Sequence, residues 1–86
     1  MILFGPMIKV RVEYFAVFRE QSGCDNEEIL TELESVKQVF EFLSDKYNFS
    51  DSIKNCKVAI NGNLVDWDSP IKANDTVFFF PPVAGG

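Results

Sequence analysis

The sequence contains no histidine and only two cysteines, Cys24 and Cys56, among its 86 residues. Without histidine the chain lacks the commonest general base and the imidazole ligand of many zinc sites. The two cysteines lie far apart and form neither a metal-binding nor a redox motif. We therefore expect two free thiols in a reducing compartment, no metal site, and no side-chain catalysis by this chain alone.

Positive charge is also scarce, with eight lysines and arginines against thirteen aspartates and glutamates, for a formal net charge of -5. Such a chain cannot neutralise many phosphates, which argues against nucleic acids and anionic membranes as partners and favours basic proteins. Nothing in their setting suggests that the carboxylates are desolvated. We interpret them as solvated surface, including Asp25, Glu27, Glu28, Glu32 and Glu34.

No apolar run approaches the roughly 20 residues of a membrane span, and the first residues lack the charged start of a signal peptide. We expect a cytoplasmic protein with one small domain. Gly5-Pro6 separates an irregular apolar segment from the regular pattern that follows. This divides the chain into an N-terminal segment (1–6), a domain (7–80) and a tail (81–86). The first segment is an extension, an alternative start or a cloning remnant.

Alternating residues from position 8 predict a half-buried strand, with Ile8, Val10, Val12 and Tyr14 inward and Lys9, Arg11, Glu13 and Phe15 outward. Phe15 interrupts the polar outer pattern, so it either contacts a partner or turns inward where the strand ends. A short helical turn is expected over 16–21, with Arg19 and Glu20 as an exposed ion pair. Residues 28–33 are the expected hairpin partner of the first strand.

The one long helix is predicted after Ser35. Ser35 is a favoured N-cap residue, and Gln38 three positions later completes a capping box. An apolar stripe follows, with Phe42 off the stripe and exposed or covering a loop. The stripe consists of Val36, Val39, Phe40, Leu43 and Tyr47.

Asn61-Gly62-Asn63 predicts a hairpin between 57–60 and 64–65, and Asn74-Asp75 a tight turn. In the last strand, 76–80, Val77 and Phe79 share one face, and Thr76, Phe78 and Phe80 share the other. This order predicts an α+β domain with one helix across one face of a mixed sheet of four to five strands. If the first and last strands are neighbours, Phe15 and Phe80 lie close together on the uncovered face, where Leu64 could join them.

The tail begins with Pro81-Pro82, which ends the strand and favours an extended chain. Six residues span at most about 20 Å, and Gly85 and Gly86 keep the tip narrow enough for a tunnel in another protein. The useful chemical group at this tip is the α-carboxylate of Gly86. A carboxylate must be activated, for example as an acyl adenylate, so a separate activating enzyme is expected.

Three segments resemble the MoaD-type small subunit of molybdopterin synthase, a sulfur carrier with the β-grasp, or ubiquitin-like, fold. They are Tyr14 to Gly23, Ile60 to Val65, and Asp75 to Gly86 with its diagnostic Pro-Pro-Val-Ala-Gly-Gly ending. The resemblance covers residues 7–86. The sequence departs from the family at Asn74, where glycine is usual, although asparagine tolerates positive φ, and at residues 1–6.

The resemblance implies that the chain binds no cofactor itself. A ubiquitin-activating-type enzyme would use ATP to adenylate Gly86, which would become a thiocarboxylate. This tip would enter the large synthase subunit, in a heterotetramer of two small and two large subunits. Its sulfur would attack cyclic pyranopterin monophosphate, and two deliveries would build the dithiolene that binds molybdenum.

The resemblance also implies which residues meet the partners. The contact with the large subunit would involve Phe15, Leu64, Phe78, Phe80, Pro81, Pro82 and Val83. Arg19 matches the family motif and either contacts the activating enzyme or is a plain surface arginine.

Three other functions remain open on the sequence. The thiamine-pathway sulfur carrier shares the fold and the terminal Gly-Gly, but the Pro81-Pro82 ending and the domain-wide match speak against it. A ubiquitin-like modifier would be joined through Gly86 to lysines of target proteins. A plain interaction module would have an inert tail.

Overall fold

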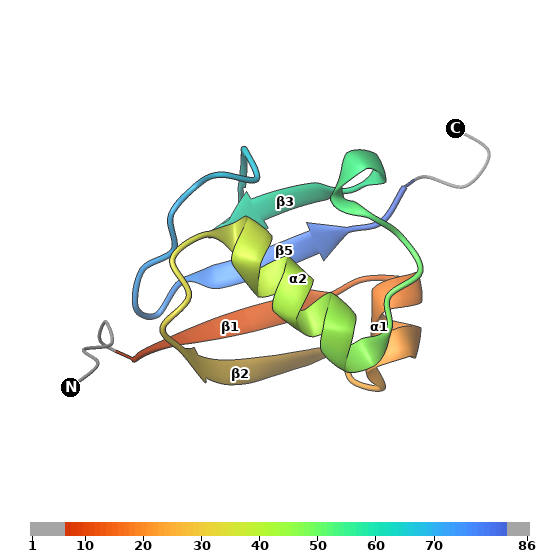
Figure 1. Ribbon diagram of the computed structural model, residues 1–86, viewed down its shortest axis with the longest axis horizontal. Helices are drawn as coiled ribbons and strands as arrows, with labels where there is room; N and C mark the ends of the chain where they lie inside the picture. The colour runs from red at the N-terminus through yellow and green to blue at the C-terminus, as the bar shows by residue number, and fades with distance from the viewer. Residues whose placement is uncertain (1–6, 83–86) are drawn as a thin grey trace.

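The computed structural model describes residues 7–82, which form a five-stranded sheet with one long helix packed on it (Figure 1). No helix within this range is long and apolar enough to span a membrane. In chain order the elements are β1 (Ile8–Tyr14), α1 (Val17–Ser22), β2 (Asn26–Thr31), α2 (Val36–Tyr47), the 3-10 helix η1 (Ile53–Asn55), β3 (Lys57–Ile60), β4 (Asn63–Val65) and β5 (Thr76–Phe80).

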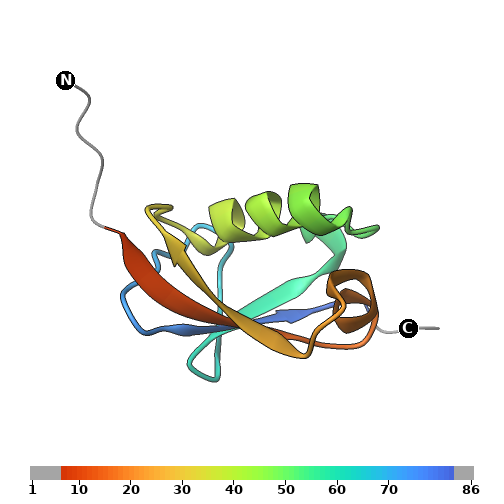
Figure 2. The same cartoon turned by 90° about the horizontal axis from the view of Figure 1, so that it is seen from below.

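The strands lie in the order β2-β1-β5-β3-β4. The first and last strands, β1 and β5, are neighbours and run parallel, whereas the other pairs are antiparallel. Helix α2 covers one face of the sheet and leaves the other open (Figure 2). The predicted mixed sheet, its single main helix and the β-grasp arrangement are confirmed.

Helix α2 begins as the sequence predicts. The side chain of Ser35 accepts a hydrogen bond from the Gln38 backbone, and the Gln38 side chain accepts one from the Ser35 backbone. These bonds satisfy amides that the first helical turn leaves without partners. The stripe is buried except at the partly exposed Tyr47, and Phe42 lies outside it, half exposed. The core between α2 and the sheet includes Val12, Phe18, Val39, Phe40, Leu43, Phe49, Val77 and Phe79.

Three elements have bounds that differ from the predicted ones, and the smallest difference is in α1, which covers Val17–Ser22 and not 16–21. Strand β2 starts at Asn26 and ends at Thr31, because pairing with β1 starts directly after the α1 turn, where Asn26 faces Glu13. The β3–β4 hairpin closes through two residues, Asn61 and Gly62, with φ of 52° and 88°. Two consecutive positive φ values match a tight primed turn, so Asn63 belongs to β4 and not to the loop.

Candidate functional site

The aromatic residues at the ends of β1 and β5 share the open face of the sheet. In β5, Val77 and Phe79 are buried beneath α2, so Phe78 and Phe80 point to the other side. Because β1 and β5 are parallel and Tyr14 lies opposite Phe79, Phe15 comes beside Phe80. The same end of the sheet carries α1 and the end of β5 (Figure 1).

Three rings stack here, and we call Phe15, Phe78 and Phe80 the aromatic face. The ring centroids of Phe15 and Phe80 lie 5.0 Å apart at an interplanar angle of 20°, and those of Phe15 and Phe78 lie 6.1 Å apart. Phe15 is 37% exposed. The alternative in which Phe15 turns inward is therefore wrong, and its predicted proximity to Phe80 is confirmed. A flat apolar surface of this kind is typical of a contact with another protein.

The β3–β4 hairpin extends the apolar surface toward the sheet edge. Ala59 faces Phe78 on one side and Leu64 on the other, so these three residues form one row across the open face. Ala59 is buried, whereas Leu64 is 70% exposed. Leu64 therefore lies on the predicted face, on the far side of Ala59 from the aromatic rings.

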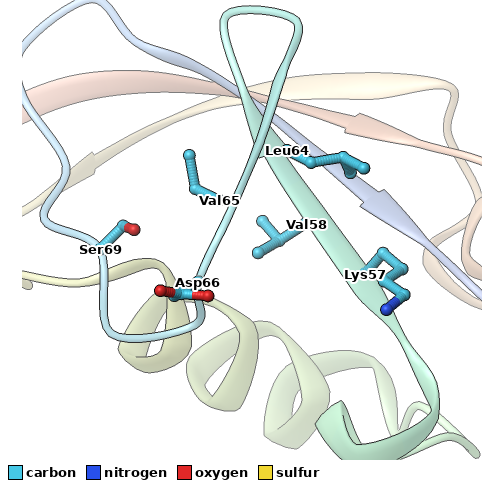
Figure 3. Close-up of a pocket in the computed structure, with 6 residues that line it drawn as sticks. All are labelled: Lys57, Val58, Leu64, Val65, Asp66 and Ser69. Carbon is cyan, nitrogen blue, oxygen red and sulfur yellow. The ribbon is translucent and has the colours of Figure 1, made fainter.

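An open hollow of about 460 Å³ adjoins this hairpin (Figure 3). The six side chains around it come from β3, β4 and the loop after β4, and both a lysine and an aspartate are among them. They are Lys57, Val58, Leu64, Val65, Asp66 and Ser69. Lys57 also pairs with Phe80 across the strands, which places a positive charge beside the root of the tail. The sequence alone did not indicate this lysine, because only the strand register brings it there.

Charged side chains border the aromatic face along β1. Glu13 lies opposite Phe78, and its carboxylate accepts a 2.7 Å hydrogen bond from Arg11 Nε. The apolar rings therefore end at an ion pair toward β2. This arrangement matches the apolar centre and polar rim of protein interfaces.

A strained backbone turn follows Phe15. Ala16 has φ of 49° and ψ of -121°, a conformation that residues with a β-carbon rarely adopt. The turn is closed by a 3.0 Å hydrogen bond from the Phe18 amide to the Phe15 carbonyl. It reverses the chain between β1 and α1 while Phe15 stays on the open face. Alanine carries no sequence signal for positive φ, so this feature could not be predicted.

Arg19, the expected contact for an activating enzyme, is exposed on α1. Its ion-pair partner is Asp25, with 3.8 Å between Arg19 Nε and Asp25 Oδ1, and not the expected Glu20. Both side chains are more than half exposed, so this pair contributes little to stability. The guanidinium is therefore available to a partner.

The interpretation of the carboxylates as solvated surface is wrong for Glu27 and for Asp75. Asp75 is buried, and its carboxylate accepts hydrogen bonds from Asn61 Nδ2 and the Lys72 amide.

Glu27 is not plain solvated surface, because its side chain is only 20% exposed and Glu27 Oε2 accepts 2.6 Å hydrogen bonds from the hydroxyls of Tyr14 and Tyr47. Lys46 Nζ lies 3.8 Å from Glu27 Oε1. Burial, and then the bond to Glu27, raise the pKa of Tyr14, and the bond to Glu27 raises that of Tyr47. This cluster joins the end of α2 to β1 and β2.

Within residues 7–82 no cluster of His, Cys, Asp or Glu could hold a metal ion. Cys56 is buried, and burial raises the pKa of its thiol to about 11. Pro81 and Pro82 follow the aromatic face directly. The remaining predicted site residues, Val83, Gly85 and Gly86, lie outside the described residues.

The chain is similar to known proteins over most of its length. Residues 12–86 match the ThiS family. The chain is 34% identical over 80 residues to the molybdopterin synthase sulfur carrier subunit of Escherichia coli, covering 90% of this chain and 99% of that protein.

Solved structures of similar fold include the following two. One is a complex of subunits 1 and 2 of molybdopterin-converting factor from Helicobacter pylori, with 26% identity, a TM-score of 0.62 and coverage of 92% and 100% of the two chains. The other is the small archaeal modifier protein 1 from Methanosarcina acetivorans, with 28% identity, a TM-score of 0.76 and coverage of 95% and 100%.

Proposed function

The chain belongs to the ThiS family of sulfur carriers, and from this premise we propose that it is the sulfur-carrier subunit of a molybdopterin synthase. The single observation that supports this most is the aromatic face, because it continues through β5 directly into Pro81 and Pro82. A partner bound to these rings is well placed to receive the tail. The E. coli relative bears the corresponding name.

The proposed chemistry takes place at the carboxyl group of Gly86. A ubiquitin-activating-type enzyme transfers AMP from ATP to this carboxylate, and pyrophosphate leaves. A donor of sulfide-level sulfur then attacks the acyl carbon and displaces AMP, which yields a thiocarboxylate. Adenylation is required because a free carboxylate is a poor acceptor for nucleophiles. Gly85 and Gly86 carry no side chain that could react in place of this carboxylate.

The sulfur of the thiocarboxylate then attacks cyclic pyranopterin monophosphate inside the large subunit, and water cleaves the acyl–sulfur bond, which leaves the Gly86 carboxylate. Two loaded carriers therefore supply the two sulfurs of each dithiolene. In this proposal the large subunit supplies the catalytic groups. The H. pylori structure, a complex of two different subunits, supports a partner of this kind. The proposed assembly is a heterotetramer of two small and two large subunits.

The proposed compartment is the cytoplasm. Both cysteines of the chain lie in the described part and are free thiols. Free thiols are stable in a reducing compartment.

The direct test of the chemistry is intact mass spectrometry after incubation with ATP, an activating enzyme and a sulfur source. We expect a mass increase that equals the replacement of one oxygen by sulfur, located at Gly86. In Gly86→Ala the sulfur transfer should be lost while thermal unfolding stays unchanged. Adducts on lysines of other proteins, without transfer to a pterin, would instead identify a protein modifier. An unmodified mass under these conditions refutes the carrier function.

The docking surface is tested by Phe80→Asp. The substitution removes one ring of the stack and places a charge where the interface would desolvate it, so the affinity for the large subunit should fall at least about 30-fold. Phe42→Asp is the matched control, because Phe42 is an exposed phenylalanine outside the aromatic face. Circular dichroism should show that both variants fold. Equal affinity of the two variants contradicts the proposed docking surface.

A further inference from the structure

The exposed large apolar side chains of residues 7–82 fall into two groups. Phe15 and Leu64 lie on the open face, Phe15 beside Phe80 and Leu64 in the row of Phe78 and Ala59. The other group contains Met7, Leu30 and Phe42, which are 59%, 69% and 50% exposed. These three line a hollow of about 250 Å³ together with Thr31, Glu32 and Leu33, and we call this hollow the β2 groove.

The β2 groove lies far from the aromatic face. Met7 precedes the start of β1, whereas Phe15 follows its end, and Leu30 is in β2, the strand at the sheet edge opposite β4. Figure 1 shows β2 and β3 on opposite sides of the central strands. A partner in the β2 groove therefore leaves the aromatic face free, and this inference is independent of the proposed function.

Strand β2 also has an unpaired edge. Among the described residues it pairs with β1 alone, in the antiparallel register from Asn26 to Thr31. An edge of this kind can accept an additional strand from another protein through backbone hydrogen bonds. The groove at the end of β2 would then receive an apolar side chain of that strand.

The charge around the groove selects the partner. The segment from Asp25 to Glu34 contains five carboxylates and no lysine or arginine. On the outer face, Glu28 forms a loose 4.0 Å pair with Lys9. Glu32 and Glu34 are exposed and belong to none of the ion pairs found within residues 7–82. A strand with basic side chains complements this rim.

Two other occupants fit the charge less well. A second copy of the chain that paired β2 with β2 would bring two segments together that each contain glutamates and no lysine or arginine, so it offers no positive charge to this rim. The segment Met1 to Pro6 is joined directly to Met7 and is apolar, but it contains no lysine or arginine to match Glu32 and Glu34.

We propose that the β2 groove binds an extended segment of a partner protein in which apolar and basic residues alternate, added as a strand beside β2. The apolar residue of this strand that lies at the end of β2 enters the groove lined by Leu30 and Phe42, and the basic residues meet the glutamates of the rim. The site recognises a second protein at the end of the sheet opposite the tail.

The test uses a blocked seven-residue peptide of alternating lysine and leucine, titrated into the ¹⁵N-labelled full chain. We expect amide shift changes in residues 26–33 and around Phe42. Leu30→Ser and Phe42→Ser should weaken binding at least about tenfold. Leu64→Ser is the matched control, because Leu64 is equally exposed at the opposite edge, and it should bind as the unmodified chain does.

Five results would overturn the proposal. Four of them are the absence of shifts in β2, equal binding of a glutamate and leucine peptide, an equal loss of binding in Leu64→Ser, and dimerisation through β2 in analytical ultracentrifugation. A fifth is a tenfold gain in affinity on deletion of residues 1–6, which would identify that segment as the occupant. Circular dichroism of each variant separates loss of binding from loss of fold.

Discussion

The strained turn at Ala16 makes a prediction about stability. Ala16 is exposed and has φ of 49° and ψ of -121°. The β-carbon of Ala16 is the cause of the strain in this conformation. A positive φ costs a residue with a β-carbon about 1–2 kcal/mol, and glycine avoids this cost. Glycine also lowers the free energy of unfolding by about 0.4–1 kcal/mol, because it gives the unfolded chain more conformational freedom than alanine does. Ala16→Gly should therefore stabilise the domain by about 0.8 kcal/mol.

This gain corresponds to a rise in the melting temperature of about 3–6 °C for a domain of this size. Thermal unfolding followed by circular dichroism measures it directly. Ala73→Gly is the matched control, because Ala73 is also exposed but is not among the residues with positive φ. The control should lose about 0.4–1 kcal/mol. If Ala16→Gly destabilises the domain as much as Ala73→Gly does, the turn is not strained.

Three further predictions concern the buried polar groups. The pKa of Tyr14 is raised above its ordinary value of 10.0, so the folded state holds the hydroxyl proton more tightly than the unfolded state does. The protonated hydroxyl therefore stabilises the domain fully below about pH 10, and this stability is lost as the pH rises further. In urea unfolding above about pH 10, Tyr14→Phe should make the fall of the unfolding free energy less steep by about 1.4 kcal/mol per pH unit. An unchanged slope would contradict the assignment. Glu27→Gln should cost about 1–3 kcal/mol in the same assay at neutral pH, since two tyrosine hydroxyls lose a charged acceptor, and unaltered stability would show that the bonds are weak. Cys56, with a pKa of about 11, should be alkylated more slowly than the partly exposed Cys24 at about pH 8, as peptide mass mapping would show, and equal rates would place Cys56 at the surface.

Local sequence signals predicted the elements of this fold well. The capping box of Ser35 and Gln38 predicted where α2 begins, and Asn61-Gly62 predicted the hairpin. Each of these signals acts over a few neighbouring residues, and the tertiary structure needs only to be compatible with it. Asn74, where the family usually has glycine, keeps the expected turn with φ of 70°.

The missed features depend on residues far apart in the chain. Glu27 was assigned to the solvated surface because its partners, Tyr14 and Tyr47, lie 13 and 20 positions away. The start of β2 was placed two residues late because the register with β1 decides it. The β2 groove had no signal either, since Met7, Leu30 and Phe42 belong to three different segments.

The amino-acid sequence by itself determined the chain's local elements, its scarcity of catalytic side chains and the glycine ending on which the proposed chemistry rests. These properties follow from residue types and short spacings, which act before any long-range contact forms. Only the tertiary structure decided that Phe15, Phe78 and Phe80 stack as one surface and that the other exposed apolar group lies at the opposite end of the sheet. The parallel pairing of β1 with β5 is the physical reason, because it brings Phe15 next to the root of the tail and leaves Met7 at the far end.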